Sequence, residues 1–310
     1  MIPAGAGLPR HVPRGVRPAL EELLALRRHG AAMRRLLALD AVRREGTRAG
    51  AFRNQGMDYA ESRPYSAGDD VRRIDWRVTA RTGRAHTKIF RPERGGDVVC
   101  LVDQRAPMRF GTRAAFKSVV AAHVAALAGW AAAAGGERFG AHISGARTRH
   151  VPLGAAEGAA AALCAALADA SPFGPALAAQ EPGEEETLER LAALAAAEGP
   201  IGTRFVLVSD LAEPEETLER AAQSLRARGE LVFVCVRDPL ELRLPPPARY
   251  PLTDGRERLV LDTASADVRA AHARALQAQR ARLQRLAAHP GTRCLALCAG
   301  EDLFSMRAAA

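Results

Sequence analysis

The strongest constraint on the fold is the regular alternation of apolar runs and helix-like stretches after the first third of the chain. Continuous apolar runs end at Asp103 and Asp210, and another covers residues 231–236. Such runs are typical of parallel strands that are covered on both faces. Stretches of helical length lie between them, and one has Pro214 near its start and Gly229 after its end. The pattern predicts an α/β fold with a mostly parallel sheet and helices on both faces.

The longest uncharged stretch, 118–136, approaches the length of a membrane span but is dominated by Ala and contains His123 and Gly129. We therefore expect a buried helix there and no membrane span. The expected helices cover about 113–134, 156–169, 184–197 and 266–289, and the expected strands cover 98–103, 138–143, 148–152, 204–210, 231–236, 258–262 and 292–297.

The remaining N-terminal third differs in composition. Residues 1–17 are rich in Gly, Pro and Arg and are predicted to be a disordered basic tail. Leucine spacing over 20–39 predicts one or two amphipathic helices, and 63–76 has the pattern of turn, strand, turn. The predicted organisation is therefore a tail (1–17), a helical and β extension that packs on the main domain (18–96), and the α/β domain (97–304).

Positive charge is concentrated in this N-terminal third. Residues 1–94 hold 20 Lys and Arg against 10 Asp and Glu, whereas the rest of the chain holds 24 against 25. A basic segment can bind nucleic acid, an anionic membrane surface or an acidic protein face. The predominance of Arg over Lys also fits a GC-rich genome, and no nucleic-acid-binding motif accompanies the charge. Nucleic-acid or anionic-surface binding is therefore kept as an alternative only.

The five cysteines are odd in number and lie mostly in apolar runs, which argues against a disulfide framework. Cys294 and Cys298 could form a metal pair, but their LeuAlaLeu context favours a buried strand. The first residues lack the apolar core of a signal peptide. We therefore predict a cytoplasmic protein.

Asp103 and Asp210 are the first candidate site residues, because each ends a predicted strand. Ligands of open parallel sheets bind at the carboxyl ends of the strands, where the strand order reverses. If the two strands are neighbours, the two carboxylates converge and could hold a hard divalent cation.

Four further stretches carry a family resemblance. They are ArgProTyrSerAlaGlyAspAspValArgArgIleAspTrpArgValThrAlaArg at 63–81, PheGlyThr at 110–112, AspProLeuGlu at 238–241 and AlaAspValArgAlaAlaHis at 266–272. From about residue 20 to 304 the chain resembles the bacterial family called domain of unknown function 58. The resemblance implies a Rossmann-like von Willebrand factor A domain and genes beside those of MoxR-type AAA+ ATPases. It further implies a non-catalytic adaptor or co-chaperone that helps such an ATPase act on a client protein.

The chain departs from the metal-ion-dependent adhesion site of von Willebrand factor A domains, which reads Asp-x-Ser-x-Ser. Here Asp103 is followed by Gln104, Arg105, Ala106 and Pro107, and the loop at 171–183 contains no Thr. We expect a degenerate site without a cofactor, in which Asp103 and Asp210 would be the ligands of any Mg²⁺. One hypothesis is that Arg105 takes the place of the cation and pairs with Asp210 or Asp103. The alternative is that Arg105 points into solvent.

The 63–81 segment has two readings. Charged groups around an aromatic anchor are typical of a partner-recognition surface. Alternatively, residues 68–70 form a turn, and Asp75 makes an internal ion pair with Arg81 or Arg72. With the strand ends included, the candidate partner-binding residues are Asp103, Arg105, Asp210, Arg63, Tyr65, Asp69, Asp70, Arg72, Asp75, Trp76 and Arg81.

Catalysis is not expected. The sequence contains no Walker A run, GxSxG elbow, HExxH or fitting GxGxxG motif. Asp69, Asp70 and Asp75 could serve as paired carboxylates, but neighbouring Arg residues favour their ionised form. A metal-dependent hydrolase remains the second alternative.

Overall fold

The computed structural model of this chain describes residues 10–37, 57–64, 74–92, 96–145, 148–169, 187–253 and 258–309. The chain forms two compact units, one made of 1–40 with 96–310 and the other of 41–95. The predicted N-terminal extension is therefore divided, since 18–40 belongs to the larger unit. The reason is burial: Leu23, Leu26 and Met33 are part of the main hydrophobic core.

A seven-stranded sheet forms the centre of the larger unit, in the order β11-β10-β7-β6-β3-β4-β5. The five inner strands are parallel, whereas β5 and β11 run antiparallel to their neighbours at the two edges. This confirms the predicted α/β fold class with a mostly parallel sheet. The strands are β3 (Asp97–Asp103), β4 (Arg138–Ser144), β5 (Arg149–Ala155), β6 (Thr203–Ser209), β7 (Gly229–Arg237), β10 (Thr292–Cys298) and β11 (Arg307–Ala308).

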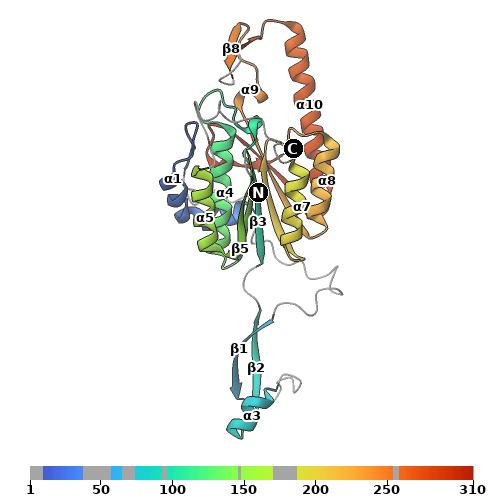
Figure 1. Cartoon of the computed structure of the whole chain (residues 1–310). Helices are drawn as coiled ribbons and strands as arrows, with labels where there is room; N and C mark the ends of the chain where they lie inside the picture. The colour runs from blue at the N-terminus through green and yellow to red at the C-terminus, as the bar shows by residue number, and fades with distance from the viewer. Residues whose placement is uncertain are drawn as a thin grey trace. The chain divides into compact units, whose positions relative to one another are not determined.

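Helices cover both faces of the sheet because the inner strands carry buried apolar residues on both faces. In β3, Val98, Cys100 and Val102 face one core, while Val99 and Leu101 face the other. Figure 1 shows the two helix layers on either side of β3. One layer holds α4 (Lys117–Ala134) and α5 (Ala156–Asp169), and the other holds α7 (Leu188–Glu198) and α8 (Glu215–Arg226).

Helix α4 confirms the prediction of a buried apolar helix. It is long and apolar enough to cross a membrane, yet 89% of it is buried inside the domain. Gly129 allows this packing, since a Cβ there would lie 2.9 Å from the Ala160 side chain of α5.

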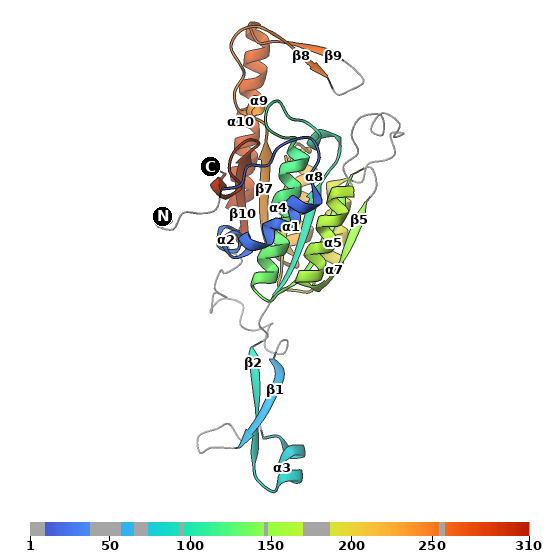
Figure 2. The same ribbon diagram turned by 90° about the vertical axis from the view of Figure 1, so that its left-hand side faces the viewer.

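The N-terminal segment adds an outer layer over α4 and α5, as Figure 2 shows. Its helices are α1 (Leu20–Ala25), the short 3-10 helix η1 (Leu26–His29) and α2 (Gly30–Leu36). The indole Nε1 of Trp130 in α4 donates to the Leu23 carbonyl at 3.0 Å. The prediction of disorder is wrong for residues 10–17, where Gly15 exchanges backbone hydrogen bonds with Ala114 and Phe116. Residues 1–9 lie outside the described part of the chain.

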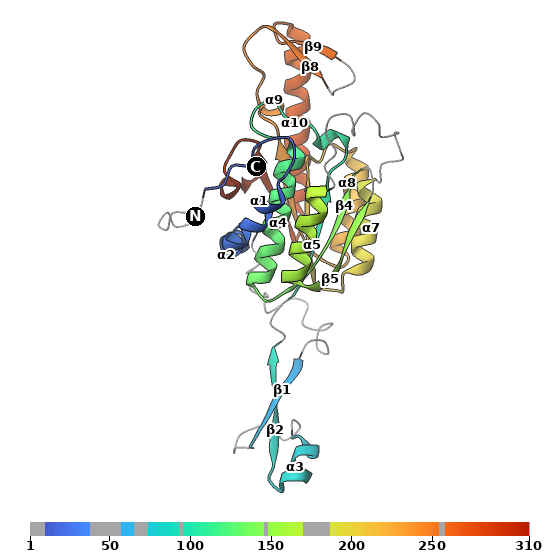
Figure 3. The ribbon, with the colours of Figure 1, turned by 60° about the vertical axis from the view of Figure 1, so that its left-hand side comes forward.

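The C-terminal part continues past the strand ends with the long helix α10 (Ala266–Ala288) and a two-stranded hairpin, visible in Figure 3. Leu283 and Leu286 fix the C-terminal end of α10 in the core beside α8. The hairpin pairs the predicted strand β9 (Arg258–Asp262) with β8 (Arg249–Thr253), which was not predicted. Short helical turns complete the unit: η3 (Ala106–Met108), α9 (Pro239–Leu242) and η4 (Leu303–Ser305).

The smaller unit pairs β1 (Met57–Pro64) with β2 (His86–Pro92) in an antiparallel ladder, with α3 (Trp76–Thr82) between them. The second turn predicted within 63–76, at Asp75 and Trp76, is in fact the start of a helix. Asp75 caps it, because its carboxylate accepts from the Arg77 and Val78 amides at 3.2 Å. Gly83 closes it in the left-handed conformation, at φ 70°.

Acidification below pH 6.5 is expected to destabilise the fold through His123 of α4. Burial lowers the pKa of His123 from its ordinary 6.5, so below pH 6.5 the unfolded chain binds a proton that the folded chain excludes. The free energy of unfolding should then decrease as the pH falls, by at most about 1.4 kcal/mol per pH unit for this group. Urea unfolding at several pH values gives the free energy of unfolding as a function of pH. This free energy should depend less steeply on pH in His123→Gln than in the wild type. The half-exposed His289 supplies the control, and equal slopes for wild type, His123→Gln and His289→Gln would refute the assignment.

Candidate functional site

The strands β3 and β6 are parallel neighbours, as predicted, so Asp103 and Asp210 lie at adjacent strand ends, a place that we call the crevice. Arg105 turns back onto Asp103: its Nε donates to Oδ1 at 3.0 Å and a terminal nitrogen to Oδ2 at 2.8 Å. Arg105 also pairs with Glu213, and the hydroxyl of Ser209 donates to Asp103 at 2.7 Å. The hypothesis that Arg105 pairs with Asp103 is confirmed, and its alternative of a solvent-directed Arg105 is wrong.

A second cation, which we did not predict, neutralises Asp210. Lys117 Nζ lies 2.7 Å from Asp210 Oδ2 and 2.7 Å from Glu241 Oε1, and its side chain is 3% exposed. Glu241 also accepts from Arg237 Nε at 3.3 Å. Arg105 therefore does not need to reach Asp210.

Both cations are held in their charged form. Burial alone would lower the pKa of Arg105, but hydrogen bonds and the charges of Asp103 and Glu213 raise it above its ordinary value. Burial likewise opposes the charge of Lys117, and Asp210 with Glu241 outweighs it and raises its pKa. The crevice is thus a closed set of ion pairs.

The turn after β6 is held under backbone strain. Leu211 is buried and adopts φ 54°, a left-handed conformation that a branched side chain rarely takes. Side chains of helix α10 bond to the backbone of this turn. Gln279 donates to the Asp210 carbonyl at 3.0 Å. Arg282 donates to the carbonyls of Leu211 and Glu213 at 2.9 and 2.7 Å. These contacts fix the direction of the Asp210 side chain.

Three of the stretches quoted for the family resemblance meet beside this crevice. Thr112 of PheGlyThr donates through its backbone amide and hydroxyl to Asp238 at 2.8 and 2.6 Å. Asp238 and Glu241 of AspProLeuGlu form the capping box of α9. His272 lies with Nε2 3.1 Å from the Leu240 carbonyl. The family motifs are therefore structural, since they tie α9 and α10 to the strand ends.

The described residues of the crevice do not fit a divalent cation. The carboxylates of Asp103 and Asp210 already bind Arg105 and Lys117, and the residues after Asp103 offer no side-chain oxygen within the predicted motif except Gln104. The Gln104 amide nitrogen instead donates to the Ser118 carbonyl at 2.9 Å. Mg²⁺ requires near-octahedral oxygen coordination, which this arrangement does not supply.

Millimolar Mg²⁺ is therefore expected to leave the thermal midpoint of the wild-type protein unchanged. A cation that bound the folded state alone would raise the midpoint as its concentration exceeds its dissociation constant. Thermal unfolding at constant ionic strength, with Ca²⁺ as the matched divalent control, measures the effect. A midpoint rise with Mg²⁺ that Asp210→Asn abolishes would restore the metal site.

The partner-binding candidates differ in burial and in whether the structure describes them. Asp103, Arg105 and Asp210 are buried, so their role in partner binding stays a prediction, and only Glu213 and Glu241 of the crevice are partly exposed. In the smaller unit Trp76 is 71% exposed, Arg81 is exposed, and Asp75 is the buried helix cap. Arg63 is described by its backbone in β1 alone. The others, with the predicted turn at 68–70, lie outside the described residues: Tyr65, Asp69, Asp70 and Arg72.

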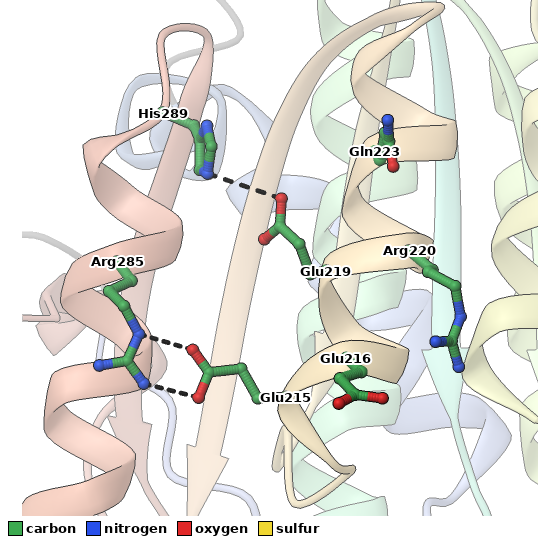
Figure 4. A pocket seen from close by; sticks show the side chains of 7 residues that line it. All are labelled: Glu215, Glu216, Glu219, Arg220, Gln223, Arg285 and His289. Carbon is green, nitrogen blue, oxygen red and sulfur yellow. Dashed lines mark hydrogen bonds and ion pairs between the residues drawn. The ribbon is translucent and has the colours of Figure 1, made fainter.

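A groove between α8 and α10 is lined by charged and polar residues (Figure 4). Arg285 binds Glu215 through two bonds of 2.6 and 2.7 Å, and His289 lies 3.6 Å from Glu219. Arg220 bonds outside the groove to Glu189. Within the groove, Arg285 and Glu215 thus neutralise each other. The lining residues are Glu215, Glu216, Glu219, Arg220, Gln223, Arg285 and His289.

Known proteins identify the family. The model described as "Protein of unknown function DUF58" matches residues 61–282. Uncharacterized protein Rv1480 of Mycobacterium tuberculosis is 31% identical over 261 residues, which cover 83% of this chain and 79% of the relative. The chain also aligns with the solved structure of conserved hypothetical protein BatB from Bacteroides thetaiotaomicron, at 12% identity and TM-score 0.34, over 59% of this chain and 87% of BatB. A von Willebrand factor type A structure from Catenulispora acidiphila aligns at 16% identity and TM-score 0.31, over 49% of this chain and 35% of that one. By its family match and its similarity to the mycobacterial protein, the chain belongs to the DUF58 family.

Proposed function

We propose that this chain is a non-catalytic protein-protein interaction module, an adaptor or co-chaperone that works in the cytoplasm with a MoxR-type AAA+ ATPase on a client protein. Membership of the DUF58 family and the von Willebrand factor A-like fold support an interaction role. The choice of ATPase follows from what the family resemblance implies.

The burial and ion pairing of the crevice carboxylates support a role without catalysis. A general acid or base must reach a substrate and exchange a proton with it. Asp103 and Asp210 are 1% and 4% exposed and are bound to permanently charged partners. In this arrangement their carboxylates hold the strand ends together and are not available for proton transfer.

The observation that carries the interaction role is the exposure of Trp76 in the smaller unit. A large aromatic side chain that is 71% exposed has lost the burial that normally stabilises it. The Asp75 cap orders the first turn of α3 and so limits the positions that Trp76 can take. Rigid exposed aromatics are typical anchors of protein interfaces. Arg77 and Arg81 are exposed on the same helix, so the complementary partner surface is acidic around an apolar pocket.

The test is binding of the full-length chain to the purified MoxR-type ATPase of its own organism, measured by surface plasmon resonance. Trp76→Ala should weaken binding by about 30-fold or more, as the loss of an anchor worth at least about 2 kcal/mol requires. Ile201→Ala is the matched control, because Ile201 is a 60% exposed apolar residue of the larger unit.

The proposal is supported if the wild type and Ile201→Ala bind the ATPase with similar affinity and Trp76→Ala does not. Absence of wild-type binding, or equal affinities for all three proteins, overturns it. If the wild type instead binds nucleic acid with an affinity that falls steeply with salt, the basic-surface alternative replaces the adaptor.

A further inference from the structure

Two histidines and a glutamate converge at the β5 edge of the sheet, outside the crevice. His142 on β4 and His150 on β5 are direct partners in the antiparallel register. Glu198 is the last residue of α7. Since Phe139, Ala141 and Ile143 of β4 face the α4 and α5 core, the alternation of the strand places His142 on the α7 face.

All three side chains point their ligand atoms at one place. Nε2 of His142 lies 2.7 Å from Glu198 Oε2, and Nε2 of His150 lies 2.9 Å from the same oxygen. The two imidazole rings stack, with centroids 4.6 Å apart. The other oxygen of Glu198 accepts from the Leu153 amide at 2.8 Å, which orients the carboxylate. Such an outer contact is typical of carboxylates that bind metals.

The position of Glu198 at the end of α7 would be stabilised by a nearby positive charge. A carboxylate at the C-terminal end of a helix faces the negative end of the helix dipole. Among the described residues, the Glu198 carboxylate is bonded by two imidazoles and one amide, and by no Lys or Arg.

We propose that His142, His150 and Glu198 bind a Zn²⁺ ion. Two imidazole nitrogens and one carboxylate oxygen are a recurrent zinc ligand set. The three ligand atoms lie within 4.8 Å of one another. Zinc bonds of about 2.0–2.1 Å in tetrahedral geometry need ligand atoms about 3.3 Å apart, so the two N–O distances open by about half an ångström. The site is independent of the proposed adaptor function.

The surroundings determine what kind of zinc site this is. His142 is almost fully buried, with 6% of its side chain exposed, whereas His150 is 45% exposed and can adjust to the ion. Three protein ligands leave a fourth position, which solvent reaches past His150 and which water fills. The ion ties β4, the edge strand β5 and α7 together. Mg²⁺ is not expected here, because it prefers oxygen ligands.

The test is calorimetric titration of the tag-free, chelator-treated full-length protein with ZnCl₂ at neutral pH, with Co²⁺ absorption as a second readout. His150→Ala and Glu198→Gln remove one ligand each. His289→Ala is the control, because His289 is a histidine of similar exposure, 46%, that lies 3.6 Å from Glu219 at another site. Cys298→Ser tests the least buried thiol.

We expect one Zn²⁺ per chain, with affinity at least about 100-fold lower in both ligand variants, since even loss of an outer partner costs about 10- to 100-fold. His289→Ala and Cys298→Ser should bind as the wild type does. Circular dichroism of the metal-free variants shows that they fold. Absence of Zn²⁺ binding by the wild type, equal binding by His150→Ala and Glu198→Gln, or loss of binding in Cys298→Ser overturns the proposal. Failure here leaves the ATPase-binding result untouched.

Discussion

Replacing Lys117 by methionine is expected to lower the free energy of unfolding by about 3–5 kcal/mol, the usual cost of removing one partner of a buried ion pair. Methionine keeps most of the apolar stem and removes only the ammonium. Asp210, with a side chain 6% exposed, would then be buried without its cation, while Glu241 keeps Arg237. Urea denaturation with a constant m-value measures the change.

The double variant Lys117→Met/Asp210→Asn distinguishes a lost ion pair from lost packing. Removing both charges should recover a large part of the stability, because a buried pair as a whole contributes little net stability. Arg220→Met is the surface control: Arg220 and Glu189 are 53% and 40% exposed, and their pair should contribute about 0–1 kcal/mol. Additive losses in the double variant, or a Lys117→Met loss no larger than that of Arg220→Met, would refute the role of Lys117.

Arg105→Met is expected to lower the free energy of unfolding by about 3 kcal/mol, at the lower end of the range for buried pairs. Asp103 would keep the Ser209 hydroxyl but lose the guanidinium, and Glu213 is partly exposed to water. Arg105→Lys retains the charge and loses the two-pronged contact, so it should cost about 1–2 kcal/mol. In chemical denaturation, the free energy of unfolding should be highest for the wild type, lower for Arg105→Lys and lowest for Arg105→Met.

The comparison of the two Arg105 variants separates charge from geometry. Equal losses would mean that the fork of the guanidinium, and not its charge, holds Asp103. No loss in either variant would contradict the contacts between Arg105 and Asp103. The Lys117 and Arg105 variants address the same structural point, that built-in cations neutralise the carboxylates at the strand ends.

Much of the fold could be predicted because it depends on local pattern. The helix at 156–169 and the strand at 258–262 have the predicted bounds. Strand β8 was missed because Pro251 and the flanking polar residues hide its pattern, and only pairing with β9 makes it a strand. The N-terminal arm was assigned to disorder by composition, but His11 bonds to Asp302 and Leu303 at the far end of the chain.

The candidate site was predictable only in part. Asp103, Asp210 and Arg105 stand next to apolar runs, and this local signal located them. Lys117 carried no such signal, because a lysine at the first position of a helix is ordinarily an exposed residue. The same holds for Glu198, whose two histidine partners are 48 and 56 residues away in sequence. The quoted motifs at 110–112 and 238–241 were the available indication that these segments meet.

The sequence by itself determined the elements and the strand ends. Apolar periodicity selects strands and helices, and the aspartates at the ends of two parallel strands, Asp103 and Asp210, lie at one edge of the sheet. The tertiary structure alone decided their partners. Salt bridges and hydrogen bonds act over a few ångströms, and strand order brings Lys117 to Asp210 across 93 residues of chain. No sequence spacing encodes such a contact, because it depends on which strands become neighbours and on the burial that excludes water from the pair.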